Sequence, residues 1–139
     1  MRLCVVDCSF AMAWVFADEK NPAADALMRR LEQGGTIVVP AVLWGLEVRN
    51  TLRSGVLRKR MTAAQADERR LALFDLPRIS VTCPAGLGNV LDRLIRTHGL
   101  TSYDAVYLAV ALEHGLSLAT GDQALATAAR SAGVAEYRA

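Results

Sequence analysis

Short apolar runs alternate with longer helical segments along this chain, and that alternation limits the possible fold more than any other feature. Apolar runs of about four residues are typical of strands buried on both faces of a parallel sheet. Strands separated by helices predict an α/β fold with a mainly parallel central sheet of about four to five strands and helices on both faces. The expected strands are residues 3–6, 36–39, 78–81, 117–119 and 134–137.

Capping residues and glycines suggest where the helices begin and end. Ser9 is the expected N-cap of the first helix, and Asn21 followed by Pro22 opens the second. Ser54 and Gly55 are expected to end the third. The expected helices are residues 9–16, 22–32, 41–53, 62–74, 87–97, 102–113 and 122–131, with a turn at 83–86.

The length and composition fit one well-filled domain over residues 1–139. A chain of 139 residues can bury a single sizeable core, and 53% of its residues are hydrophobic. The net charge of +2 is too small to indicate a nucleic-acid partner. The odd number of cysteines, without a close pair, argues against disulfides and zinc and favours a reducing cytoplasm. Asp7 interrupts the apolar N-terminal run, so we expect neither export nor membrane insertion.

Asp104 stands in the first turn of a helix that is otherwise apolar on every side. Residues 105–112 carry no charge, so this helix should be central, and an acid at its start needs a compensating partner. Capping is the alternative explanation. Ser102 could be the N-cap, and an acid in the first turn interacts favourably with the helix dipole.

Three further acids stand in comparable positions. Asp7 ends the first strand, Glu47 lies among apolar helical residues, and Asp122 precedes the last helix. Each also has an ordinary explanation. Asp7 and Asp122 could cap the helices that follow them, and Glu47 could pair with Arg49 or Arg53 in solvent.

A parallel α/β sheet would bring these four acids to one edge, beyond the carboxyl ends of its strands. Several carboxylates close together cannot all stay ionised without a cation. Oxygen ligands select a hard ion, and no histidine or close cysteine pair accompanies them. The sequence therefore predicts a Mg²⁺ or Mn²⁺ site.

Four blocks of the sequence resemble the PIN domains, and among them the VapC-type toxins of bacterial toxin–antitoxin systems. The blocks follow one another at the family's spacing across nearly the whole chain. Cys8 departs from the pattern, since Ala or Thr is more usual there, but all four acids are present. The blocks are Asp7 with Ser9; Pro40, Leu43, Glu47, Val48 and Asn50; Ser102 to Ala105 with Tyr107, Leu108, Ala109 and Ala111; and Thr120, Gly121, Asp122 and Leu125.

The resemblance implies a ribonuclease that cleaves phosphodiester bonds with one or two Mg²⁺ or Mn²⁺ ions. Asp7 and Asp104 would bind metal directly, and Glu47 and Asp122 directly or through water. The resemblance also implies a homodimer that a cognate antitoxin protein keeps inactive. We expect the antitoxin to place one of its cationic side chains among the carboxylates.

Polar and basic residues around the acids complete the predicted site. Ser9, Asn50 and Thr120 are expected to orient ligands or waters. A basic stripe beside the site is expected to bind RNA phosphates, although a solvated helix face explains it nearly as well. The stripe consists of Arg49, Arg53, Arg58, Lys59 and Arg60.

Other functions remain open at this point. A structure-specific DNA nuclease would share the chemistry, but usually carries additional helical segments for duplex contact. A receiver or phosphotransferase domain would carry a phosphorylated Asp after its first strand. A phosphoaspartate hydrolase of the haloacid dehalogenase type would need a second acid close to Asp7, and neither Cys8 nor Ser9 provides one. A non-catalytic scaffold that binds RNA or protein would keep the fold but would not need the full set of acids.

Overall fold

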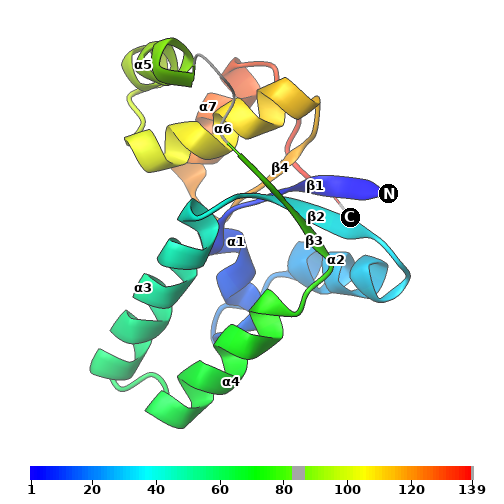
Figure 1. Ribbon diagram of the computed structural model, residues 1–139, viewed down its shortest axis with the longest axis vertical. Helices are drawn as coiled ribbons and strands as arrows, with labels where there is room; N and C mark the ends of the chain where they lie inside the picture. The colour runs from blue at the N-terminus through cyan, green and yellow to red at the C-terminus, as the bar shows by residue number, and fades with distance from the viewer. Residues whose placement is uncertain (83–86, 139) are drawn as a thin grey trace.

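A four-stranded parallel sheet lies at the centre of the molecule (Figure 1). The computed structural model describes residues 1–82 and 87–138, which leaves the expected turn at 83–86 outside it. The strand order is β3-β2-β1-β4, which confirms the expected α/β architecture. The strands are β1 (Arg2–Val6), β2 (Thr36–Pro40), β3 (Arg78–Val81) and β4 (Leu118–Ala119).

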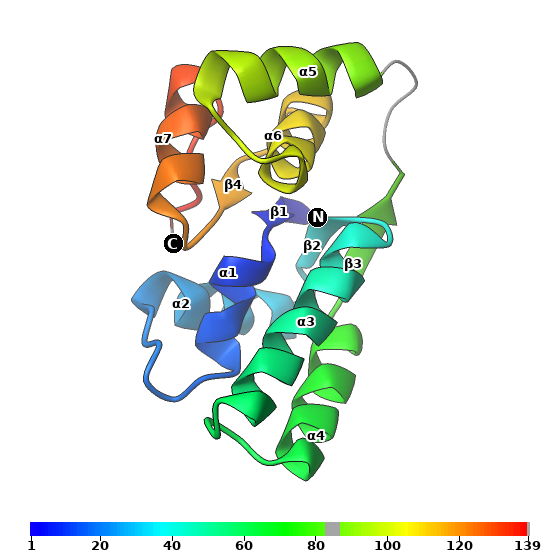
Figure 2. The same cartoon turned by 90° about the vertical axis from the view of Figure 1, so that its left-hand side faces the viewer.

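Helices cover both faces of this sheet (Figure 2). Helices α1 to α4 lie on one face and α5 to α7 on the other. Within the described part of the chain, no helix is long and apolar enough to cross a membrane. The bounds are α1 (Cys8–Ala11), a 3₁₀ turn η1 (Met12–Trp14), α2 (Pro22–Glu32), α3 (Leu43–Leu57), α4 (Ala63–Phe74), α5 (Leu87–His98), α6 (Ser102–His114) and α7 (Gln123–Ser131).

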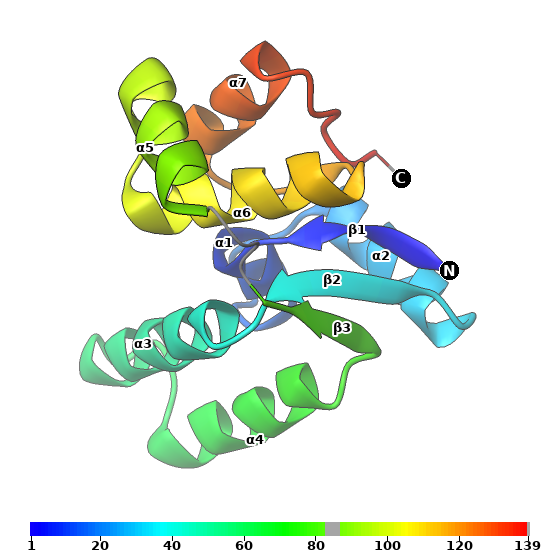
Figure 3. The same ribbon diagram turned by 45° about the horizontal axis from the view of Figure 1, so that its top comes forward.

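Strand β1 is central and buried on both faces, as its uninterrupted apolar run predicts. Val5 pairs with Val38 of β2 on one side and with Leu118 of β4 on the other. Figure 3 shows β1, β2 and β3 side by side, with α6 crossing one face. The strand expected at 134–137 is reduced to a single bridge between Leu118 and Glu136, so the sheet stops at four strands.

Two helix starts differ from the expectation. Asp7, and not Ser9, caps α1, since its carboxylate accepts the backbone N–H of Phe10. Thr101, and not Ser102, caps α6 by accepting the N–H of Asp104. In both cases the residue just before the helix has an extended backbone, and its side chain accepts one of the free N–H groups of the first turn.

Helix α3 continues past Ser54 and Gly55, where we expected it to end. Gly55 is buried inside the helix, and a Cβ there would lie 3.1 Å from the ring of Phe16. This glycine therefore permits close packing and does not mark a helix end. The helix ends at Leu57, and Lys59 then adopts a positive φ of 59°.

Candidate active site

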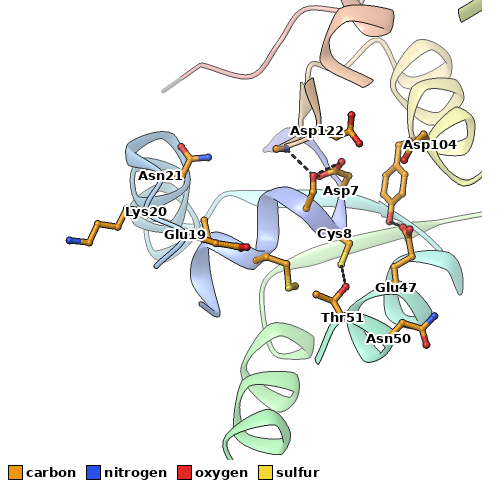
Figure 4. A pocket seen from close by; sticks show the side chains of 15 residues that line it. Asp7, Cys8, Glu19, Lys20, Asn21, Glu47, Asn50, Thr51, Asp104 and Asp122 are labelled. Atoms are coloured by element: carbon orange, nitrogen blue, oxygen red, sulfur yellow. Dashed lines mark hydrogen bonds between the residues drawn. The ribbon is translucent and has the colours of Figure 1, made fainter. Parts of the chain in front are cut away.

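The four predicted acids surround one pocket at the carboxyl edge of the sheet (Figure 4). Asp7 follows β1 and Asp122 follows β4, while Glu47 comes from α3 and Asp104 from α6. The pocket has a volume of about 660 Å³. Its lining comprises Asp7, Cys8, Ser9, Met12, Ala13, Glu19, Lys20, Asn21, Glu47, Asn50, Thr51, Asp104, Tyr107, Gly121 and Asp122.

Asp7 is the most deeply buried of these acids, and only 4% of the residue is exposed. Its carboxylate accepts the hydroxyl of Ser9 at 2.8 Å, the hydroxyl of Thr120 and the N–H of Phe10 at 2.9 Å. Burial raises the pKa of Asp7 to about 6, although these three donors oppose the shift, and the charge of Asp104 adds to it. An ionised Asp7 is therefore costly unless positive charge comes near.

The hydroxyl groups of Ser9 and Thr120 form hydrogen bonds that connect the end of β1 to the end of β4. Ser9 donates to Asp7 and accepts the N–H of Gly121 at 2.9 Å. Thr120 donates to the same carboxylate and accepts the N–H of Asp122 at 3.0 Å. A Cβ at position 121 would lie 3.3 Å from the carbonyl oxygen of Ser9, so glycine allows this close approach. Ser9 and Thr120 thus sit where residues that orient a metal ligand are expected.

Glu47 is half-buried and accepts a hydrogen bond from Tyr107, whose hydroxyl lies 2.6 Å from Oε1. Burial raises the pKa of Glu47, and the charge of Asp104 adds to this shift. Burial and the neighbouring Glu47 raise the pKa of Tyr107 above its ordinary range, so its hydroxyl stays protonated and donates. Tyr107 was not among the predicted site residues. A hydroxyl three residues after Asp104 in an apolar helix was the available signal.

Asp104 lies in the first turn of α6, Asp122 is the N-cap of α7, and both line the pocket. Asp122 caps its helix by accepting the N–H of Leu125 at 3.0 Å, so the capping explanation holds for it. One oxygen suffices for that role, and the residue still lines the pocket. Burial raises the pKa of Asp104, and the charge of Asp122 adds to the shift. Asp104 therefore interacts electrostatically with all three other acids.

The pocket wall is strongly acidic. Glu19 adds a fifth carboxylate, and Lys20 is the one cationic side chain among the described residues that line the pocket. Lys20 points away from the acids (Figure 4). Asn50 lines the pocket, as expected, beside Thr51. Glu19, Lys20 and Asn21 were not expected there, because nothing in the sequence of this connecting segment distinguishes it from any polar loop.

The five residues of the basic stripe lie outside the pocket. Arg49 and Arg53 line a separate groove between α3 and α4, and Arg49 also stacks on Phe74. Arg60 is paired with Asp18 at 2.9 Å. The remaining two, Arg58 and Lys59, are exposed just after α3.

The donor set fits a hard divalent cation. As the side chains lie, no three acidic, histidine or cysteine groups within residues 1–82 and 87–138 stand close enough to share one ion. The pocket nevertheless suits a cation, because it offers carboxylate oxygens and only one cationic side chain lines it in the described part of the chain. The pKa values of Asp7, Glu47 and Asp104 are all raised, which a bound cation would reverse.

Comparison with known proteins agrees with the fold. A model of the PIN domain family matches residues 4–131. The solved structure of PAE2754 from Pyrobaculum aerophilum is 27% identical, with a TM-score of 0.69 over 96% of this chain and 82% of the other. FitAcB from Neisseria gonorrhoeae is 16% identical, with a TM-score of 0.62 over 99% and 97% of the two chains, and supports the fold alone. Comparison with curated protein sequences gave no significant match.

Proposed function

Because the chain belongs to the PIN domain family, we propose that it is a Mg²⁺- or Mn²⁺-dependent endoribonuclease, folded as one domain over residues 1–139. PIN domains are a nuclease fold, and the proposal names the substrate and the cofactor. The observation that carries it is the convergence of four carboxylates, from four separate elements, on one pocket with a single lysine on its wall. The four are Asp7, Glu47, Asp104 and Asp122.

Each acid has a role in this proposal. Asp7 and Asp104 would hold the metal directly, and Glu47 and Asp122 would hold it directly or through water. When bound, the ion would supply positive charge that neutralises the scissile phosphate and acidifies an attacking water. Ser9 and Thr120 keep the carboxylate of Asp7 in one orientation. The expected products carry 5′-phosphate and 3′-hydroxyl ends.

Other residues serve the reaction from nearby. Asn50 orients a water or a ligand from the pocket wall. The basic stripe holds RNA phosphates beyond the pocket in this proposal, since exposed cations attract the backbone of a bound strand. Backbone phosphates are recognised without reference to base sequence, so the stripe contributes affinity and position.

We also propose that the enzyme is the toxin of a toxin–antitoxin system, and the four VapC-like sequence blocks support this role. A cognate antitoxin would keep the cytoplasmic enzyme inactive by placing a cationic side chain among the carboxylates. The pocket suits such a contact, because five acids and one lysine leave it with excess negative charge. A homodimer is the proposed oligomeric state. A complex in which no cation of the partner enters the pocket would contradict this form of inhibition.

Cleavage of total RNA by the purified, antitoxin-free protein tests the activity. We expect cleavage with Mg²⁺ or Mn²⁺, none with EDTA, and none by Asp104→Asn. Single-stranded DNA and flapped duplex DNA belong in the same assay, since preference for either would replace RNA as the substrate. A folded protein that binds Mn²⁺ but cleaves none of these substrates would point to the non-catalytic scaffold.

A further inference from the structure

Tyr107 is a buried residue whose one polar atom contacts the proposed active site. Only 1% of the residue is exposed, yet its hydroxyl lies 2.6 Å from Glu47 Oε1. This separation is typical of a hydroxyl that donates to an ionised carboxylate. Tyr107 also lines the acidic pocket, so the contact lies at the site itself and not in a remote part of the core.

The contact joins two helices that each contribute an acid. Glu47 comes from α3, and Tyr107 lies on α6 three residues after Asp104. Residues three apart on a helix share a face, so α6 presents a carboxylate and a hydroxyl to the same pocket. The hydroxyl reaches across to the acid of the other helix, which couples the position of Glu47 to the helix that carries Asp104.

No other hydrogen-bond donor to Glu47 occurs among residues 1–82 and 87–138. A glutamate has three side-chain torsions, and an unrestrained one loses considerable entropy when it binds a ligand. Tyr107 occupies Oε1 and leaves Oε2 without a donor in the same part of the chain. One oxygen is thus fixed by the protein and the other remains available to a ligand.

We propose that Tyr107 is a positioning residue, which holds Glu47 by Oε1 so that Oε2 faces the metal or its bound water. This inference rests on the proposed metal-dependent function. Tyr107 itself does not contact substrate in this proposal and acts only through Glu47. Hydrogen-bonding partners of metal ligands typically change metal affinity by about 10-fold to 100-fold when they are removed.

Mn²⁺ affinity, measured by electron paramagnetic resonance on the full chain without RNA, tests the inference. We expect Tyr107→Phe to bind Mn²⁺ about 10-fold to 100-fold more weakly than the wild type. Tyr137→Phe is the matched control, because Tyr137 is also buried and its hydroxyl has no hydrogen-bond partner among the described residues. The control should bind Mn²⁺ like the wild type. Circular dichroism and the Tm of each variant verify that it folds.

A double-mutant cycle with Glu47→Ala distinguishes positioning from a general packing effect. If Tyr107 acts through Glu47, Tyr107→Phe should weaken Mn²⁺ binding no further once Glu47 is removed. High Mn²⁺ concentration should also restore most of the RNA cleavage by Tyr107→Phe. An equal loss in both backgrounds, or no loss in the single variant, would overturn the positioning role.

The same experiment separates the two proposals. In one outcome the wild type binds Mn²⁺, Asp104→Asn weakens this binding, and Tyr107→Phe does not. That result would overturn the positioning role and leave the proposed function intact. A wild type that binds no Mn²⁺ would overturn both.

Discussion

Thr120 donates its hydroxyl hydrogen to Asp7, and this contact joins the end of β4 to the end of β1 across 113 residues of sequence. The same oxygen accepts the N–H of Asp122, so one threonine links two of the four acids. Because the two strands are adjacent and parallel, their carboxyl ends meet at one edge. The site is therefore held together by the topology of the sheet and by hydroxyl groups that fix the acids.

Thr120→Val keeps the shape of the side chain but removes this donor. The buried carboxylate of Asp7 then loses one of its three hydrogen-bond donors, which should lower the free energy of unfolding by about 1–3 kcal/mol. RNA cleavage should fall about 10-fold to 100-fold. Denaturant unfolding and initial cleavage rates measure the two effects. Thr120→Ser retains the hydroxyl and should lie near the wild type; a valine variant equal to the serine variant would contradict the role.

Asp7→Asn should separate stability from activity. The raised pKa of Asp7, about 6 against an ordinary 3.8, corresponds to roughly 3 kcal/mol of unfavourable free energy for the ionised form. Removing the charge should raise the free energy of unfolding of the metal-free protein at neutral pH by about 1–3 kcal/mol while abolishing cleavage. Asp25→Asn, at an exposed position on α2, is the matched control and should be neutral or slightly destabilising. A metal-free Asp7→Asn protein that is less stable than the wild type would argue against this account.

The pH dependence of stability should follow from the same residue. The folded protein keeps a proton on Asp7 up to about pH 6, whereas the unfolded chain releases it near 3.8. The contribution of Asp7 to stability is therefore greatest below about pH 4 and is lost as the pH rises to about 6. Glu47 and Asp104 shift in the same direction.

Unfolding of the metal-free wild type and of Asp7→Asn, compared at several pH values, isolates this effect. The advantage of the variant should grow between about pH 4 and 6 and then level off. Saturating Mg²⁺ should reverse the ranking at neutral pH, because only the wild type gains from binding. Stability curves that run parallel across this range would show that Asp7 titrates normally.

The positions of the four acids could be predicted because they depend on topology more than on local detail. An apolar strand followed by Asp7, and a second strand followed by Asp122, must meet at one edge once the sheet is parallel. Asp104 was identifiable because its helix is otherwise apolar on every side, and an acid carried into the interior by such a helix needs a compensating partner. Ser9 and Thr120 follow from the same reasoning, since each is within two residues of an acid.

Local capping and side-chain contacts were harder to predict. Ser9 and Asp7 are both good N-caps, and only the geometry at the strand end decides that Asp7 takes the role while Ser9 donates to it. Gly55 was misinterpreted as a helix end because sequence cannot show that Phe16 packs against it. Tyr107 was missed for a similar reason, since periodicity places its ring in the core but not its hydroxyl against Glu47.

The basic stripe can be tested through the salt dependence of RNA binding. The measurement uses an Asp104→Asn background, which prevents cleavage. The logarithm of the binding constant for a single-stranded RNA should fall linearly with the logarithm of the salt concentration, and the slope reports how many phosphates the protein neutralises. Arg53 is exposed and has no acidic partner among the described residues, so Arg53→Ala should reduce the slope by about 0.7. Arg60 already pairs with Asp18, so Arg60→Ala should change the slope less. Arg29→Ala, on α2 outside the stripe, controls for net charge. Equal slopes for the Arg53 and Arg29 variants would show that the stripe is an ordinary solvated face and that RNA approaches the acids from another direction.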